Sequence, residues 1–337
     1  MPQVIDAKKV PNYVLSNGEK VPCIGMGTFG SDRFTPDQVS EAVAGAIRCG
    51  YRLFDCASVY GNEDLIGGVF KKAIKEGYVK REELFVTSKV WNDMHGEGDV
   101  AKALDKTLKD LCLDAIDAYF VHWPFPNYHA PGCDGDSRNP DSVPFSVDRF
   151  MATWRQMEQL FDKGLVRNIG MSNMTIPKLE AVLPLCRIRP TLIEMELHPC
   201  FQQKVLFDYC VKEKIQPIGF CPIGSPTRPD RDIAEGDVVD TAVPALVEIA
   251  KAHNVHPAII CIKWSVQRGA IPIPFSVHEA EYISNLRCTT EAPLTEAEMK
   301  TLEGVECNNR LVKGQVFLWE NAKGWEDLWD LDGTITK

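Results

Sequence analysis

Four residues of the sequence have the side chains that proton transfer to a carbonyl requires. Three short apolar runs follow one another in the chain, and each is typical of a buried strand. A polar or titratable residue stands at or shortly after the carboxyl end of each run, which is where a barrel of parallel strands carries out its chemistry. The runs are 53–54, 84–88 and 116–121, and the four residues are Asp55, Tyr60, Lys89 and His122.

These residue types suit acid catalysis near neutral pH. A tyrosine hydroxyl has an ordinary pKa near ~10 and is by itself a weak acid toward a carbonyl. We expect the ammonium of Lys89 to lower that pKa, and Asp55 to hold the lysine in place. A neutral His122 can donate a hydrogen bond to the substrate oxygen and orient it. The set includes neither a covalent nucleophile nor a metal site, so it predicts hydride transfer to a carbonyl with Tyr60 as the acid.

Longer motifs surround these residues: GYRLFD at 50–55, YGNE at 60–63 and GLVRNIGMSN at 164–173. With them the chain resembles the aldo-keto reductase superfamily, NAD(P)-dependent carbonyl reductases on a TIM barrel, and is most similar to its aldose and xylose reductases. The resemblance covers about residues 14–332. It implies that the four residues above form the catalytic tetrad of an oxidoreductase acting on the CH–OH/C=O pair.

The rest of the chain alternates helical segments with apolar runs, the pattern of repeated βα units. We therefore expect the α/β class, with residues 1–337 forming one domain, a (β/α)8 TIM barrel. Ser16-Asn17-Gly18 predicts an N-terminal β-hairpin that closes the barrel floor. Predicted helices are 36–49, 63–76, 100–111, 148–163, 176–185, 204–213 and an extra helix at 242–253. Predicted strands are 23–26, 53–54, 84–88, 116–121, 166–171, 191–197, 215–220 and 270–274.

Three long segments break this rhythm, at 124–147, 225–240 and from 305 to the end. Such loops at the active face of a barrel usually shape the substrate pocket. The last segment carries aromatic residues that could either form a lid or only pack the tail onto the barrel. These residues are Phe317, Trp319, Trp325 and Trp329.

Residues 25–30 read GMGTFG and match the dinucleotide fingerprint GxGxxG. That motif needs its glycines to open a helix, whereas the next helix begins only at Thr35-Pro36 and no second mononucleotide-binding half follows. We therefore reject a Rossmann domain. The resemblance instead implies that Thr28 and Phe29 line the nicotinamide side of the coenzyme.

The composition of the chain excludes several classes of binding partner. The net charge of −10 gives no basic surface for nucleic acid, and no apolar run is long enough to cross a membrane. The twelve cysteines are scattered without a CxxC pair, which favours reduced thiols and a cytoplasmic protein. We expect a monomer or homodimer that binds a small carbonyl substrate. His253 and His256 could pair on a metal, but His256 precedes Pro257 and is better explained as a helix cap.

The resemblance also implies a coenzyme site on the later strands. Ser172 and Asn173 fall where the family holds the carboxamide, and Phe220 falls where an aromatic ring stacks on the nicotinamide. The motif PIGSP at 222–226 matches the loop that folds over the pyrophosphate. The coenzyme-binding residues implied are Thr28, Phe29, Asp55, Ser172, Asn173, Glu194, Phe220, Ile223, Ser225, Ser276, Glu281 and Asn285.

Several positions depart from the family pattern. Glu194 replaces the usual Gln and loses its amide donor. Phe275 and Glu281 replace the Lys and Arg that pair with the 2′-phosphate of NADP. Thr227 replaces the Asp that latches over the pyrophosphate. Because a carboxylate repels a phosphate and suits free ribose hydroxyls, we expect NAD(P)H dependence with NADH favoured. Flanking arginines that could restore NADPH binding are Arg228, Arg231 and Arg287.

The substrate is predicted from the residues near the tetrad. Trp91, Trp123 and Phe125 would give apolar walls beside Tyr60 and His122. In the tail, the sequence NNR at 308–310 resembles the Asn-x-Arg of xylose reductases and assigns Asn309 to sugar hydroxyls. An aldose or sugar-derived aldehyde is therefore predicted. The alternatives are keto-sugars, keto-acids or other carbonyls, and a non-catalytic barrel subunit that only binds coenzyme.

Overall fold

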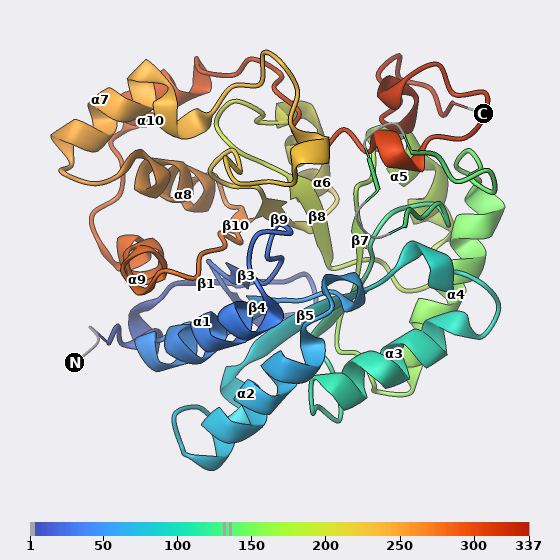
Figure 1. Cartoon of the computed structure of the whole chain (residues 1–337), viewed down its shortest axis with the longest axis horizontal. Coiled ribbons are helices and arrows are strands. Elements are labelled where there is room, and N and C mark those ends of the chain that lie inside the picture. The colour runs from blue at the N-terminus through green and yellow to red at the C-terminus, as the bar shows by residue number, and fades with distance from the viewer. Residues whose placement is uncertain (1–3, 131–132, 135–136, 337) are drawn as a thin grey trace.

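The computed structural model describes residues 4–130, 133–134 and 137–336. At its centre lies a parallel eight-stranded sheet in the order β10-β9-β8-β7-β6-β5-β4-β3, with helices around it (Figure 1). The strands are β3 (Met26–Gly27), β4 (Leu53–Asp55), β5 (Phe85–Val90), β6 (Ala118–Val121), β7 (Ile169–Ser172), β8 (Leu192–Glu196), β9 (Gln216–Phe220) and β10 (Ile271–Pro272). Backbone hydrogen bonds join the two edges, from Gly25 N to Pro272 O at 3.0 Å and from Gly27 N to Pro274 O at 3.1 Å. The predicted (β/α)8 barrel is therefore confirmed.

Helices follow the barrel strands in turn, and α7 and α10 are additions to the βα repeat. They are α1 (Pro36–Cys49), α2 (Glu63–Lys75), α3 (Asp99–Asp110), α4 (Val147–Asp162), α5 (Ile176–Val182), α6 (Lys204–Lys212), α7 (Pro244–Ala252), α8 (Pro257–Gln267), α9 (Glu279–Arg287) and α10 (Glu296–Glu303). Predicted helix ends agree within two residues, except that 183–185 form a 3-10 turn. Lys89, expected just after its strand, lies inside β5, because pairing with β6 continues to Val90.

A hairpin closes the amino end of the barrel, as predicted. Strands β1 (Asn12–Val14) and β2 (Lys20–Pro22) pair antiparallel, and Gly18 in the turn has a φ of 87°. Leu15 and Val21 of the hairpin are buried in one cluster with side chains from inside the barrel. That end is therefore filled by apolar packing, which leaves the carboxyl ends of the strands for the site.

The glycines of the GMGTFG segment serve the closure of the barrel. A Cβ at Gly25 would lie 2.1 Å from a methyl of Leu53, and a Cβ at Gly27 would lie 2.9 Å from the Ile273 carbonyl oxygen. The next helix, α1, begins only at Pro36, and its N-cap is Thr35. The rejection of a Rossmann turn is thus confirmed.

The C-terminal tail, red in Figure 1, lies beside α5. Lys178 of α5 forms a buried ion pair with Asp330 at 2.5 Å and donates to the Leu328 carbonyl oxygen at 2.8 Å. These contacts anchor the tail above the carboxyl ends of the strands. Across the described ranges, the helices lack the combination of length and hydrophobicity that a membrane crossing requires.

Candidate active site

Lys89 lies at the centre of the predicted tetrad. Its ammonium donates to both carboxylate oxygens of Asp55, at 2.7 and 2.8 Å, and to the Cys56 carbonyl oxygen at 2.9 Å. The same nitrogen lies 5.4 Å from the centre of the Tyr60 ring. The Tyr60 and His122 rings are 6.0 Å apart and meet edge to face. The structure therefore brings together all four residues that the sequence placed at successive strand ends.

Strand register explains this meeting. Asp55, the last residue of β4, pairs in register with Thr87 of β5, and Lys89 lies two residues further along the same strand. Residues i and i+2 of a strand point to the same side. Thr87 Oγ1 therefore also reaches Asp55, donating to Oδ1 at 2.6 Å. Thr87 was not predicted as a site residue, although its two-residue spacing from Lys89 was available as a signal.

The proton of Tyr60 is held more firmly than predicted. Burial raises the pKa of the Tyr60 phenol above its ordinary value, and the Lys89 ammonium only partly opposes that rise. Lys89 thus lowers the pKa as expected, but the net shift is upward, because removing the phenolate from water costs more than one nearby cation returns. Tyr60 therefore carries its proton at neutral pH.

His122 is neutral in this environment. Burial lowers the pKa of its imidazole well below the ordinary value, and the nearby Lys89 and His95 lower it further. Its Nδ1 has no hydrogen-bond partner among the described residues. A neutral imidazole can donate one hydrogen bond, which is what the sequence analysis required of it.

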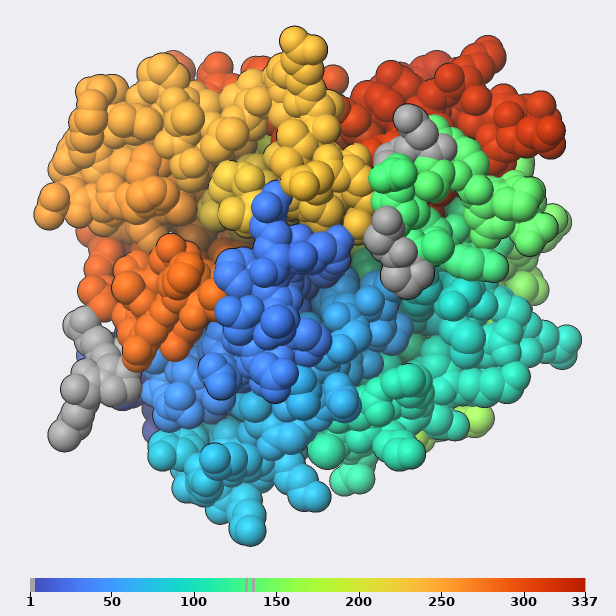
Figure 2. Space-filling model, in the orientation of Figure 1, coloured from blue at the N-terminus to red at the C-terminus, as the bar shows by residue number. Residues whose placement is uncertain are grey.

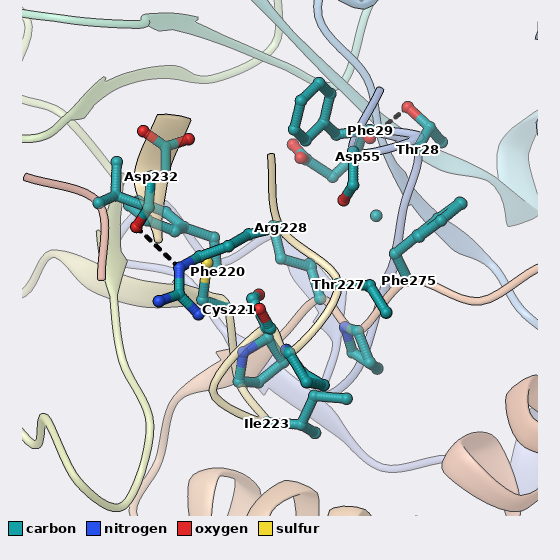
Figure 3. Close-up of a pocket in the computed structure, with 18 of the residues that line it drawn as sticks. Thr28, Phe29, Asp55, Phe220, Cys221, Ile223, Thr227, Arg228, Asp232 and Phe275 are labelled. Carbon is teal, nitrogen blue, oxygen red and sulfur yellow. Dashed lines mark hydrogen bonds between the residues drawn. The ribbon is translucent and has the colours of Figure 1, made fainter. Parts of the chain in front are cut away.

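A cavity of about 1010 Å³ opens from the tetrad, at the upper end of the range for cofactor sites. Figure 3 shows Phe29 and Asp55 on one side of it and Cys221, Arg228 and Ile223 on the other. The predicted site residues that line it are Thr28, Phe29, Asp55, Tyr60, Trp91, His122, Trp123, Ser172, Asn173, Glu194, Phe220, Ile223, Ser225, Glu281 and Asn285.

Four of the predicted residues lie outside this lining, and the first is Lys89, which is 1% exposed and bonded to Asp55. Ser276 donates from Oγ to Glu281 Oε2 at 2.6 Å, so it contacts a lining residue without lining the cavity itself. Phe125 packs in the aromatic cluster formed by Trp123 and the tail. The Asn309 side chain bonds to the backbone of Val238: its Nδ2 donates to the carbonyl oxygen at 2.9 Å, and its Oδ1 accepts from the amide at 3.1 Å.

The two histidines weighed as metal ligands have other roles. His253 Nε2 lies 2.7 Å from Glu298, and His256 Nδ1 accepts a hydrogen bond from the Ala258 amide as the cap of α8. Within the described part of the chain, no three His, Cys, Asp or Glu side chains are grouped to hold a metal ion.

Residues 23–306 match the Aldo/keto reductase family. The chain belongs to this family. It is 36% identical over 319 residues to an aldo/keto reductase of Synechocystis sp., covering 94% of this chain and 96% of that one. It is 38% identical over 300 residues to aldo-keto reductase family 1 member A1 of Gallus gallus, covering 88% and 89%.

Solved structures agree with this assignment. A Bombyx mori aldo-keto reductase in complex with NADP superposes with a TM-score of 0.80 at 29% identity, covering 92% of this chain and 96% of that one. An aldo-keto reductase complexed with NADPH gives the same TM-score at 28% identity, with 93% of each chain covered. This chain is thus an oxidoreductase of the aldo/keto reductase family.

The cavity of this aldo/keto reductase has the polar groups that an amide-bearing ligand needs. Glu194 Oε1 and Asn173 Oδ1 are buried without a hydrogen-bond partner among the described residues, and both side chains line the cavity. Asn173 is fixed by donating to the His122 carbonyl oxygen at 2.9 Å, and its φ is 58°. Phe220 supplies a flat apolar wall nearby. These residues fit a nicotinamide group.

The two positions where the resemblance implies a Lys and an Arg for a 2′-phosphate hold Phe275 and Glu281, and both line the cavity. Phe275 packs against Phe34, with ring centres 5.7 Å apart, and Glu281 places a carboxylate in the first turn of α9. Of the arginines considered as substitutes, Arg228 is buried in contact with Asp237, and Arg231 is paired with Asp32 at 2.7 Å. Arg287 also lines the cavity.

The segment 225–240, here called the strap, closes over one side of the cavity. Arg33 donates from Nε to the Thr227 carbonyl oxygen at 2.9 Å and pairs with Asp230 at 2.7 Å. Arg231 of the strap pairs in return with Asp32. In Figure 2 the dark-blue segment around residue 30 accordingly meets the yellow strap. Two ion pairs, neither of them predicted, thus link the strap to residues 32–33 where the resemblance implies a latching Asp at position 227.

Aromatic side chains form the wall beside the tetrad. The Trp91 ring lies 5.0 Å from His122 and 6.0 Å from Phe317 of the tail, and Trp123 lies 4.6 Å from Phe317. Phe317 and Val316 line the cavity, so the tail contributes to the pocket as well as packing on the barrel. Trp319 and Trp329 are buried in the same cluster, behind this wall.

Proposed function

We propose that this aldo/keto reductase uses NAD(P)H to reduce an aldehyde to the corresponding alcohol, with Tyr60 as the proton donor. The observation that carries the proposal is Lys89, which bonds to Asp55 at 2.7 Å and lies 5.4 Å from the centre of the Tyr60 ring, and Tyr60 itself lines the cavity. The coenzyme, when bound, supplies a hydride. The side chains that would hold its nicotinamide end are Ser172, Asn173, Glu194 and Phe220.

Each residue of the tetrad then has a distinct role. Tyr60 donates its hydroxyl proton to the oxygen of the carbonyl as that oxygen gains charge. His122, neutral because of burial, donates a hydrogen bond to the same oxygen and orients it. Lys89 stabilises the phenolate that Tyr60 becomes, and Asp55 fixes the ammonium in place. Water is excluded by the aromatic wall of Trp91, Trp123 and Phe317.

The same wall indicates the substrate class. Phe29 lies 5.1 Å from the Tyr60 ring and Trp91 lies 5.0 Å from His122, and such apolar rings favour an aldehyde with an aromatic or alkyl body. The aldose proposal depended on Asn309, whose side chain is engaged with Val238. We therefore rank apolar aldehydes above aldoses, and both above keto-acids. The twelve cysteines are all free thiols, which supports a reducing, cytoplasmic setting.

The variant Tyr60→Phe tests the role of the hydroxyl. We expect kcat with an aromatic aldehyde to fall about 10²–10⁴-fold, the usual contribution of a positioned acid, while coenzyme binding is retained. Tyr119→Phe is the matched control, since Tyr119 is buried in β6 and does not line the cavity. Unchanged turnover in Tyr60→Phe would refute the assigned role. A panel of aromatic aldehydes, aldoses and keto-acids ranks the substrates by kcat/KM.

We further propose that NADH is preferred over NADPH. Support comes from Phe275 and Glu281, which line the cavity and stand where the resemblance implies the Lys and Arg that pair with a 2′-phosphate. Each charged hydrogen bond to such a phosphate is worth about 1.5–3 kcal/mol. The double variant Phe275→Lys/Glu281→Arg should therefore shift the NADPH/NADH ratio of kcat/KM upward by at least about tenfold. A wild-type enzyme that is faster with NADPH would end this idea.

A further inference from the structure

Glu194 is a buried carboxyl group whose hydrogen-bonding capacity is not met by the nearby Lys89 ammonium. It lies in β8, is 1% exposed and lines the cavity, and its Oε2 is 3.4 Å from Lys89 Nζ. The three protons of that ammonium already go to Asp55 Oδ1, Asp55 Oδ2 and the Cys56 carbonyl oxygen. Glu194 Oε1 has no partner in the described part of the chain. The Lys89 ammonium is therefore close to Glu194 but has no N–H left to donate to it.

The charges at this point do not balance if both carboxyl groups are ionised. Asp55 takes up the single positive charge of Lys89 and also accepts from Thr87. An ionised Glu194 would have to share that one cation with Asp55, and the buried group would carry a net negative charge, which is costly. The titratable groups facing it are Asp55 of β4, Lys89 of β5 and Tyr60. On the two neighbouring strands, Glu194 pairs in register with Ser172 of β7 and Ile218 of β9, and neither residue is charged.

We propose that Glu194 is a positioning residue that keeps its proton in the resting enzyme and, as a neutral carboxylic acid, holds the nicotinamide carboxamide. The second half of this statement rests on the coenzyme site proposed above. A neutral acid has one donor and one acceptor, so it restores the amide-like donor that an ionised glutamate lacks. Buried carboxyl groups kept neutral at pH 7 serve as donors in this way. Burial, and then Asp55, raises the pKa of Glu194 well above its ordinary value, in agreement with the geometry.

The protonation state is measured on the enzyme without coenzyme. In the infrared difference spectrum of wild type minus Glu194→Gln at neutral pH, we expect the carbonyl stretch of a protonated carboxyl group. An ionised-carboxylate band in its place would overturn the proposal. Glu63→Gln is the matched control: Glu63 is also buried, accepts from Ser88 and Thr107, and does not line the cavity. This measurement is independent of substrate and turnover, so it stands even if the proposed reaction is wrong.

Coenzyme binding tests the second half. Dissociation constants of NADH and, in parallel, NADPH are measured by calorimetry without a carbonyl substrate. Glu194→Gln keeps a neutral donor and acceptor and should stay within about twofold of wild type, whereas Glu194→Leu should bind about tenfold more weakly. Glu63→Gln should bind like wild type. A Glu194→Gln enzyme that binds tenfold differently from wild type, or a Glu194→Leu enzyme that binds equally well, would overturn the proposal.

Discussion

Stability at alkaline pH should depend on His198, a fully buried imidazole held between two carboxylates. Its Nε2 lies 3.1 Å from Glu196 and its Nδ1 lies 2.9 Å from Asp240. Burial alone would lower the pKa of His198, but the two carboxylates raise it from 6.5 to about 9. Glu196 also accepts hydrogen bonds from the Leu311 and Val312 amides, at 2.7 and 2.8 Å. The cluster thus joins β8, the end of the strap and the start of the tail.

The sign and size of the effect follow from linkage. A folded-state pKa above the unfolded value means that the native protein binds the proton more tightly. The stabilisation from protonated His198 is complete below pH 6.5, falls as the pH rises from 6.5 to about 9, and is lost above about 9. The gap between 6.5 and about 9 corresponds to about 3 kcal/mol of unfolding free energy.

Urea unfolding of wild type and His198→Gln between pH 6 and 10 measures this contribution. Buried cysteines such as Cys210, whose pKa burial raises to about 12, also lower stability in this range, but they cancel in the difference between the two proteins. We expect that difference to shrink by about 3 kcal/mol from pH 6 to pH 10. If the variant does not fold, NMR of the native protein should show that one of its seven histidines titrates near pH 9. A constant difference, or no imidazole titrating above pH 8, would refute the reasoning.

Two further predictions concern the tail. Lys178→Met leaves Asp330 as a buried unpaired carboxylate, so we expect a loss of about 3–5 kcal/mol in the unfolding free energy and a higher KM for the aldehyde, measured by urea unfolding and steady-state kinetics. The double variant Lys178→Met/Asp330→Leu should regain most of that stability, and no recovery would contradict the ion-pair explanation. Phe317→Ala removes a wall that touches Trp91 and Trp123, so KM for small aromatic aldehydes should rise about tenfold with little change for aldoses. Equal changes for both substrate classes would argue against an aromatic pocket.

The tetrad was predictable because its placement depends on short-range pattern. Asp55 and Lys89 each belong to a buried apolar run, and adjacent parallel strands bring their carboxyl ends together once the barrel forms. The pKa of Tyr60 was not predictable in the same way. The direction of its shift depends on how much water the surrounding chain removes from the phenol. Contacts from several strands and loops together determine that loss of water. Asn309 failed to reach the cavity for a related reason: its partner Val238 lies 71 residues away in the chain.

The strap illustrates a limit of comparison by position. Thr227 stands where the resemblance implies a latching Asp, and that substitution predicted the loss of the latch. Here the anchor is the Thr227 carbonyl oxygen, which any residue would supply, and the charge that meets it comes from Arg33, 194 residues earlier. Because the Arg33–Asp230 pair is largely exposed, its worth is about 0–1 kcal/mol. This pair alone therefore holds the strap weakly, and firmer attachments lie near the end of the strap, where Asn309 bonds to Val238 and Asp240 lies 2.9 Å from His198.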